Sequence, residues 1–220
     1  VLPRHALRRH WREAWLLAER DAFLSKLPRR NHLEISLFCY DTAPVGALLD
    51  VLATLPNASL VHVPPGKPLQ AVTRHLGGMP PWQHGRTCIE ALPFLPLDEY
   101  DRLLWQCDIN FVRGEDSFVR AQWAGKPFVW QIYEQDEKAH LAKLAAFLDR
   151  YCAEMDADLA KITQELFVAW NGETADLTSA LHNFIDNRDA LAKTSLAWSQ
   201  HLAAQADLAS ALVKFCAARV

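Results

Sequence analysis

The sequence predicts an α/β fold in which a parallel, doubly wound sheet is followed by a helical C-terminal extension. Short apolar segments alternate with helical ones through the middle of the chain, and this repeated β-α order is typical of a parallel sheet. Segments such as residues 128–130 are apolar throughout, as expected for strands covered on both faces. Beyond Tyr133 the apolar residues fall on helical stripes.

Five strands and four intervening helices make up the predicted α/β part. Apolar and β-branched runs predict strands at residues 34–40, 59–63, 87–92, 108–112 and 127–132. Helical periodicity between them predicts helices at 45–55, 68–76, 98–105 and 117–123. Later stripes predict helices over 141–151, 159–170 and 208–215, with breaks at Asn171-Gly172 and Asn187-Arg188.

The start of the chain has a different pattern. Residues 5–27 predict an amphipathic helix in which Trp11 and Trp15 share one apolar stripe, and residues 28–31 end it. We therefore divide the chain into an N-terminal helix with its linker, residues 1–31, and an α/β domain with C-terminal helices, residues 32–220. The two tryptophans need a partner surface, on this domain or elsewhere.

Composition and charge predict an ordinary globular protein. The chain has 220 residues, of which 50% are apolar, and this suffices for a sizeable core. Its 23 basic and 26 acidic residues give a net charge of −3, so we expect no nucleic-acid or membrane surface. A local basic cluster fits either a solvated helix face or an acidic partner, and consists of Arg4, His5, Arg8, Arg9, His10 and Arg12.

Cysteine and histidine spacing argues against disulfides and metal. The five cysteines are scattered and form no Cys-x-x-Cys pair, so we expect reduced, buried thiols. His84 and Cys88 form an isolated pair without two further ligands, so no metal site is expected. The sequence contains neither an apolar run of about 18 residues nor a signal-like apolar core, and we expect a cytoplasmic protein.

The most informative segment runs from Asn110 to Phe118. An apolar strand leads into Arg113-Gly114, after which Glu115-Asp116-Ser117 opens a helix. Free backbone N–H groups, the helix dipole and the arginine charge make such a junction a pocket for anions such as phosphate. Glu115 can accept hydrogen bonds from ribose hydroxyls, as acids near doubly wound strands often do. The alternative is that these acids cap the helix, with Asp116 or Ser117 as N-cap.

Longer runs around this segment carry a family resemblance. They are Ser-Leu-Phe-Cys-Tyr at 36–40, Leu-Pro-Phe-Leu-Pro at 92–96, Arg-Gly-Glu-Asp-Ser at 113–117 and Ala-Gln-Trp-Ala-Gly-Lys-Pro-Phe-Val-Trp-Gln-Ile-Tyr at 121–133. In these runs, and from about residue 34 to the C-terminus, the chain closely resembles the bacterial arginine rhamnosyltransferases that modify translation elongation factor P.

This resemblance implies a fold and a reaction. The expected fold is a GT-B glycosyltransferase, in which two Rossmann-like domains face each other across a cleft, and this chain resembles the second, donor-binding domain. The implied donor is dTDP-β-L-rhamnose, the acceptor is an arginine of elongation factor P, and the reaction inverts the anomeric centre. The resemblance implies neither a metal nor another cofactor.

The resemblance also assigns roles to individual residues. Phe94 stacks on thymine in this assignment, although an aromatic residue in an apolar run is more often a core residue and only the family context favours stacking. Arg113 and Ser117 bind the pyrophosphate, while Asp116 organises the same turn and caps the helix. Glu115 holds the ribose and is the residue of this chain that we name as a catalytic candidate.

Residues at the ends of the first and last strands complete the expected site. Tyr40 can donate its phenol to a phosphate oxygen, or it can be a buried tyrosine with a satisfied hydroxyl. Gln131 and Tyr133 are weaker candidates at the same edge. Leu97 stands where relatives carry a glutamine that contacts the donor, and this departure affects one base or ribose contact.

A carboxylate that orients or deprotonates the acceptor guanidinium is missing from the expected site. In this family such acids belong to the N-terminal domain, whereas the acids before residue 34 lie on a predicted solvated helix. We therefore expect the chain alone to bind donor without transferring rhamnose. The alternative is a non-catalytic nucleotide or nucleotide-sugar binding module, and a weaker third interpretation is a GT-B enzyme with another donor.

Overall fold

A single six-stranded sheet organises the protein. The computed structural model describes residues 18–28, 30–135, 138–172, 176–205 and 208–218. The strands are β1 (Leu33–Leu37), β2 (Ser59–Val63), β3 (Trp82–His84), β4 (Thr87–Ala91), β5 (Ile109–Arg113) and β6 (Phe128–Gln131). Their order is β3-β4-β2-β1-β5-β6, and every pairing is parallel except that of β3 with β4. The predicted α/β class with a doubly wound sheet is thus confirmed.

Two differences from the predicted strands are larger than one residue. The first strand ends at Leu37, three residues before the predicted end at Tyr40. Phe38 still donates its N–H to the Phe111 carbonyl, but the N–H of Tyr40 bonds to the Gln131 side chain, so Tyr40 lies in a loop. The antiparallel strand β3 was not predicted, because three residues are too few to show a period.

Four helices connect the strands, and further helices follow them. The connecting helices are α2 (Val45–Thr54), α3 (Lys67–Leu76), α4 (Leu97–Gln106) and α5 (Gly114–Ala124). The later ones are α6 (Ala139–Tyr151), α7 (Ala157–Trp170), α8 (Leu177–Asp186), α9 (Arg188–Ala204) and α10 (Leu208–Ala217). The predicted breaks at Asn171 and Asn187 are confirmed as the C-caps of α7 and α8. No helix in the described part of the chain is long and apolar enough to cross a membrane.

The N-terminal helix is described only in part. Residues 18–24 are helical, whereas Trp11 and Trp15 lie outside the described residues. Arg20 connects this helix to α5, since its Nη1 atom donates to the carbonyl of Ala124 at 3.4 Å. The helix therefore lies on the α4 and α5 side of the sheet, where Phe23 also packs edge-on against Trp105 of α4.

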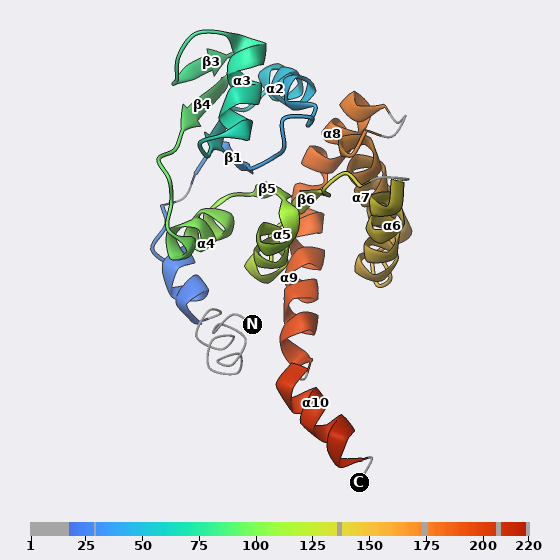
Figure 1. Ribbon diagram of the computed structural model, residues 1–220. Coiled ribbons are helices and arrows are strands. Elements are labelled where there is room, and N and C mark those ends of the chain that lie inside the picture. Colours follow the sequence, from blue (N-terminus) through green and yellow to red (C-terminus); the bar gives the residue numbers. More distant parts are fainter. Residues whose placement is uncertain (1–17, 29, 136–137, 173–175, 206–207, 219–220) are drawn as a thin grey trace.

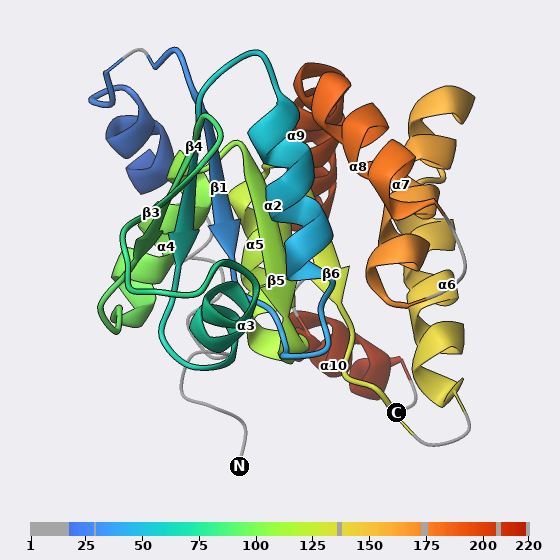
Figure 2. The same ribbon diagram turned by 90° about the horizontal axis from the view of Figure 1, so that it is seen from above.

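Helices cover the sheet on both faces (Figures 1 and 2). One face carries α2, α3, α7 and α8, and the other carries α4 and α5, with α9 passing beside α5. Helix α10 projects from the body of the domain at the far end of α9 (Figure 1). Because both faces are covered, β1 is buried along its entire length, and its two polar residues, Glu34 and Ser36, are hydrogen-bonded.

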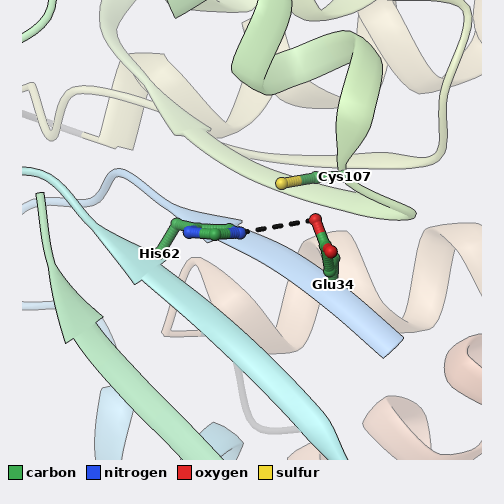
Figure 3. A group of neighbouring side chains, drawn as sticks. All are labelled: Glu34, His62 and Cys107. Atoms are coloured by element: carbon green, nitrogen blue, oxygen red, sulfur yellow. Dashed lines mark hydrogen bonds and ion pairs between the residues drawn. The ribbon is translucent and has the colours of Figure 1, made fainter. Parts of the chain in front are cut away.

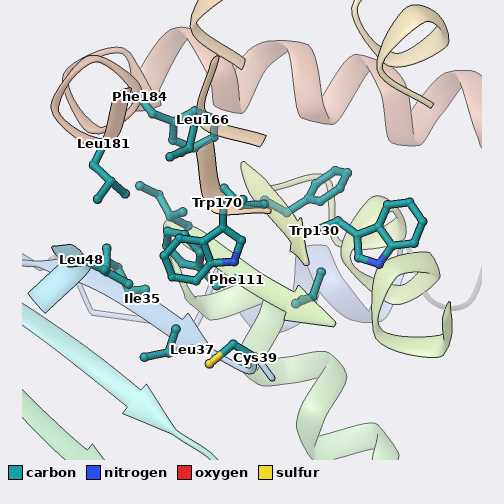
Figure 4. Close-up of a cluster of buried hydrophobic side chains, with 14 of the residues drawn as sticks. Ile35, Leu37, Cys39, Leu48, Phe111, Trp130, Leu166, Trp170, Leu181 and Phe184 are labelled. Atoms are coloured by element: carbon teal, nitrogen blue, oxygen red, sulfur yellow. The ribbon is translucent and has the colours of Figure 1, made fainter. Parts of the chain in front are cut away.

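The main core lies between the sheet and the helices α2, α7 and α8 (Figure 4). Trp170 of α7 contributes the largest fully buried side chain and packs on Phe111 of β5, with ring centroids 4.4 Å apart. Leu48 of α2 and Ile35 of β1 close the same layer. This core holds β1 and β5 side by side, and the chain winds outward from them in opposite directions. In parallel sheets that reversal opens a crevice at the carboxyl ends of the strands.

Candidate functional site

Arg113 occupies the crevice at the reversal point of the sheet. It is the last residue of β5 and the N-cap of α5, and its guanidinium carbon lies 4.5 Å from the ring centroid of Phe38 and 4.7 Å from that of Tyr40. Both rings come from the loop after β1, so the cation is held between two aromatic faces. Within the described residues, its buried Nε atom has no hydrogen-bond partner. A fixed positive charge with an unused donor therefore lies at the crevice.

Gly114 allows this arrangement. Its φ of +68° is in the left-handed region, and a Cβ there would lie 3.5 Å from the Tyr40 hydroxyl. Its carbonyl accepts a hydrogen bond of 3.1 Å from the Trp130 indole, which ties the turn to β6. The tyrosine hydroxyl thus lies directly over the first turn of α5, where backbone N–H groups lack partners within the helix.

The three polar residues after Gly114 do not cap helix α5, in contrast to the predicted alternative. Helix α5 begins at Gly114, three residues before the predicted start, and its N-cap is Arg113 without a side-chain capping bond. The interpretation of Asp116 or Ser117 as N-cap is therefore wrong. Asp116 instead accepts a 2.7 Å hydrogen bond from Arg120, which in turn pairs with Asp101 of α4 at 2.9 Å.

Glu115 and Ser117 differ in exposure. Glu115 is exposed in the first turn of α5, so its carboxylate is available to a ligand. Ser117 is 8% exposed and lies beside Tyr100 of α4. Burial raises the pKa of the Tyr100 phenol, and Ser117 acts in the opposite direction. The Ser117 side chain therefore faces α4, and its backbone N–H remains the group directed to the helix N-terminus.

A pocket of about 560 Å³ lies beside Tyr40, which connects it to the turn at Gly114, although residues 113–117 themselves do not line it. Its volume is in the range of small-molecule sites. It is lined by Tyr40, Asp41, Thr42, Lys67, Ile132, Tyr133, Glu134, Gln135, Lys138 and His140. Tyr40 and Tyr133 meet edge to face in its wall, with ring centroids 5.8 Å apart, and Tyr133 is 62% exposed. The structure therefore brings the two predicted tyrosines together at one pocket.

Lys67 is a pocket residue that the sequence interpretation did not name. It begins α3 after Gly66, and its Nζ atom lies 3.0 Å from Asp41 Oδ1 and 5.8 Å from the Tyr40 ring centroid. This lysine lowers the pKa of the Asp41 carboxyl through their hydrogen bond. The available signal was a Gly-Lys pair at a strand-to-helix junction, the position where anions bind most readily.

Three other predicted residues lie in different settings. The Gln131 amide accepts from the Tyr40 N–H at 2.7 Å and donates to Thr42 at 3.1 Å, so it positions the loop after β1. Phe94 is 85% exposed in the loop after β4, and the alternative of a core position is wrong. Leu97 is 53% exposed at the first position of α4.

Cysteine chemistry is not available at the crevice. Cys39 is fully buried within the loop after β1, and burial raises the pKa of its thiol to about 12, with the Arg113 charge offsetting only part of this. The thiol is therefore neutral at physiological pH. Cys107 and Cys152 are also buried, whereas Cys88 is partly exposed and Cys216 is exposed, so the prediction of buried thiols holds for three of the five.

One buried polar group at the other end of the sheet has the residue types of a metal site (Figure 3). Glu34, His62 and Cys107 lie together, and the imidazole Nε2 of His62 is 3.4 Å from Glu34 Oε2. That same oxygen is paired with Arg30 and accepts a 2.7 Å hydrogen bond from Gln106. The carboxylate charge is thus already compensated, and the group is a buried hydrogen-bond network.

Comparison with known families gives one match over almost the whole chain. The model of the family described as Elongation-Factor P (EF-P) rhamnosyltransferase EarP matches residues 4–217.

Similar curated proteins carry one description. Protein-arginine rhamnosyltransferases of Pseudomonas aeruginosa and Pseudomonas putida are each 40% identical to this chain, over 94% and 93% of its length. The corresponding protein of Shewanella oneidensis is 36% identical over 92% of the chain. The matches cover 59%, 59% and 58% of these relatives, so the chain spans a little under three fifths of their length.

A solved structure resembles the fold closely. It comes from work on EarP-mediated arginine glycosylation of translation elongation factor EF-P, and it superposes with a TM-score of 0.77 at 36% sequence identity. The superposition covers 97% of this chain and 71% of the solved chain.

Proposed function

Because this chain belongs to the EarP family of elongation factor P rhamnosyltransferases, we propose that it forms the donor-binding part of a protein-arginine rhamnosyltransferase. The donor is dTDP-β-L-rhamnose, the acceptor is an arginine of elongation factor P, and transfer inverts the anomeric centre. We place the reaction in the cytoplasm, where translation factors act. The curated relatives support the activity through their description, and the crevice at Arg113 supports donor binding.

The observation that carries the proposal is the setting of Arg113. Its guanidinium lies between Phe38 and Tyr40 at the N-terminus of α5, and its buried Nε has no partner in the described part of the protein. Buried donors are nearly always hydrogen-bonded in native proteins, so a ligand oxygen is the expected partner. A pyrophosphate supplies such oxygens together with the negative charge that the cation and the helix terminus favour.

Neighbouring residues complete the donor site in this proposal. The Tyr40 hydroxyl, held over Gly114, donates to a phosphate oxygen, and Lys67 adds a second positive charge. Exposed Glu115 accepts hydrogen bonds from the ribose, and the exposed ring of Phe94 stacks on thymine. Tyr133 lines the pocket wall, while Gln131 acts indirectly by holding the Tyr40 loop.

These groups act on the leaving group of the reaction. A guanidinium nitrogen of the acceptor attacks the anomeric carbon, the bond from that carbon to the diphosphate oxygen breaks, and dTDP leaves with the electron pair. Arg113, Lys67 and the first turn of α5 stabilise the charge that develops on the diphosphate. A carboxylate must accept the proton of the guanidinium, and we assign it to the part of the relatives that this chain does not match.

Calorimetric titration tests donor binding. We expect the chain to bind dTDP and dTDP-rhamnose in preference to UDP. We expect Arg113→Ala to lose affinity for both thymidine ligands by about 10-fold to 100-fold, because hydrogen bonds to charged groups contribute about 1.5–3 kcal/mol. The matched control is Arg86→Ala, which removes an exposed arginine at the other end of the sheet whose side chain bonds only to the Pro56 carbonyl among the described groups.

Equal affinity of wild type and Arg113→Ala would reject the site. Tight binding without preference among the nucleotides would instead favour a general nucleotide-binding module. A separate assay with elongation factor P and dTDP-rhamnose follows transfer by mass spectrometry. We expect no rhamnosylation by this chain alone, and measurable transfer would show that it carries its own proton acceptor.

A further inference from the structure

Asp50, His75 and His84 converge on one point of the surface, although they come from three elements. Asp50 lies in α2, His75 in the last turn of α3 and His84 at the end of β3. Asp50 Oδ1 lies 3.0 Å from the Nε2 atom of His75 and 2.8 Å from the Nε2 atom of His84. All three potential ligand atoms lie within 4.8 Å of one another. Two imidazole nitrogens and one carboxylate oxygen thus face a common centre.

Close backbone packing holds the two histidines in place. A Cβ on Gly46 would lie 2.8 Å from Nδ1 of His75, so this ring is pressed against the backbone of α2 one turn before Asp50. Gly85, with a φ of +58°, lies so close to α2 that a Cβ would be 2.5 Å from the Ala53 carbonyl oxygen. This second contact lies about one turn after Asp50 and sets the position of His84. Two glycine contacts therefore place the imidazoles on either side of the carboxylate.

The geometry fits a metal ion with little rearrangement. Zinc bonds to imidazole nitrogen and carboxylate oxygen are about 2.0–2.2 Å, so neighbouring ligand atoms around such an ion are about 3.0–3.5 Å apart. The observed separations of 2.8 and 3.0 Å are close to this range. Imidazole and carboxylate donors suit divalent transition metals, and two histidines with one carboxylate leave coordination positions for water.

We propose that Asp50, His75 and His84 form a surface site for a divalent transition-metal ion of the zinc type. The site is distinct from the donor pocket, because none of the three residues lines that pocket. Each side chain is partly exposed, with 56%, 33% and 34% accessible for Asp50, His75 and His84, so the ion exchanges with solvent. Bound metal joins α2, α3 and the short edge strand β3, and it stabilises this edge of the sheet.

The buried group of Glu34, His62 and Cys107 does not compete as a site. There the carboxylate oxygen that faces His62 is already paired with Arg30 and Gln106. At the surface site, in contrast, Asp50 is bonded to the two imidazoles, which are themselves the other two ligands of the proposed site. A bound metal ion therefore replaces two hydrogen bonds of Asp50 by one metal bond. No arginine has to be displaced first, in contrast to Arg30 at the buried group.

Titration with zinc chloride tests the proposal on the full chain after chelator treatment. We expect one ion per chain at this site, a rise in melting temperature on binding, and with Co²⁺ the visible absorption of a coordinated ion. Asp50→Asn, His75→Gln and His84→Gln each remove one ligand and should each weaken zinc binding at least tenfold. His201→Gln, which changes an exposed histidine on α9, is the matched control and should bind as the wild type does.

Circular dichroism establishes that each variant is folded before its affinity is compared, and three independent ligand variants keep the test decisive if one of them unfolds. The proposal is overturned if the wild type takes up no zinc, or if all folded ligand variants bind zinc as tightly as His201→Gln. The zinc affinity of the Arg113→Ala variant separates the two sites. This substitution should weaken nucleotide binding and leave zinc affinity unchanged.

Discussion

Replacing Glu34 by glutamine removes the negative charge at the centre of a buried network while keeping the size of the side chain. The Glu34 side chain is 4% exposed and pairs with Arg30, and it accepts hydrogen bonds from Gln106 at 2.7 Å and from His32 at 3.0 Å. Removing one partner of a buried ion pair costs about 3–5 kcal/mol, because the other charge is left uncompensated. Glutamine retains part of the hydrogen bonding, so we expect a loss near the lower limit, about 3 kcal/mol.

Urea and thermal unfolding followed by circular dichroism measure this loss. For a chain of this size, about 3 kcal/mol corresponds to a decrease in melting temperature of about 6–12 °C. Glu154→Gln is the matched control, because Glu154 is exposed in the turn between α6 and α7 and should change stability by less than about 0.5 kcal/mol. A loss below about 1 kcal/mol for Glu34→Gln at pH 7 would refute the inference that this carboxylate holds the network together.

The pH dependence gives a second check on Glu34. Burial alone would raise the pKa of this carboxyl, but hydrogen bonds from His62, Arg30 and Gln106 outweigh burial and lower the pKa well below its ordinary value of 4.5. Since the folded-state pKa lies below the unfolded one, the stabilisation is complete above about pH 4.5 and is lost as the pH falls further. The stability difference between wild type and Glu34→Gln should therefore shrink on acidification below this value, and a difference that grows there would contradict the assignment.

Two further substitutions probe the packing around the sites. Gly85→Ala should destabilise the protein by about 2 kcal/mol or more. A left-handed φ costs about 1–2 kcal/mol for a residue with a Cβ, and that Cβ would also lie 2.5 Å from the Ala53 oxygen. Thermal unfolding measures the loss, and an unchanged melting temperature would contradict it. Asn171→Ala should lower the free energy of unfolding in urea by about 1–3 kcal/mol and should weaken nucleotide binding. The Asn171 side chain bonds to the Ile132 N–H and to the Trp130 carbonyl, both at 2.9 Å, and so holds the end of β6 beside the pocket. Normal stability together with normal affinity would show that this cap is dispensable.

The succession of elements followed from local sequence patterns. Short runs rich in apolar and β-branched residues located β2 at its observed ends, and β5 and β6 to within one residue at each end. Helix breaks at Asn171 and Asn187 were likewise visible as local turn signals. The junction at Arg113 and Gly114 was predicted for the same reason, because a strand, a glycine and a helix in succession define a turn without knowledge of the rest of the chain.

Other features depended on contacts between distant residues. The short strand β3 forms because it pairs with β4, and Gln131 is an internal support because its amide meets the loop after β1. Helix α5 begins at Gly114, before the predicted start, and the polar side chains after it do not cap it.

By itself, the sequence determined the α/β class, the order of the five parallel strands and their four connecting helices, and the basic turn at Arg113, because these depend on periodicity and on neighbouring residues. Only the tertiary structure decided which distant side chains meet. It placed Arg113 between Phe38 and Tyr40, and it brought Asp50, His75 and His84 together. Such meetings depend on strand register and on how closely helices approach, and neither property is encoded in the spacing of residues along the chain.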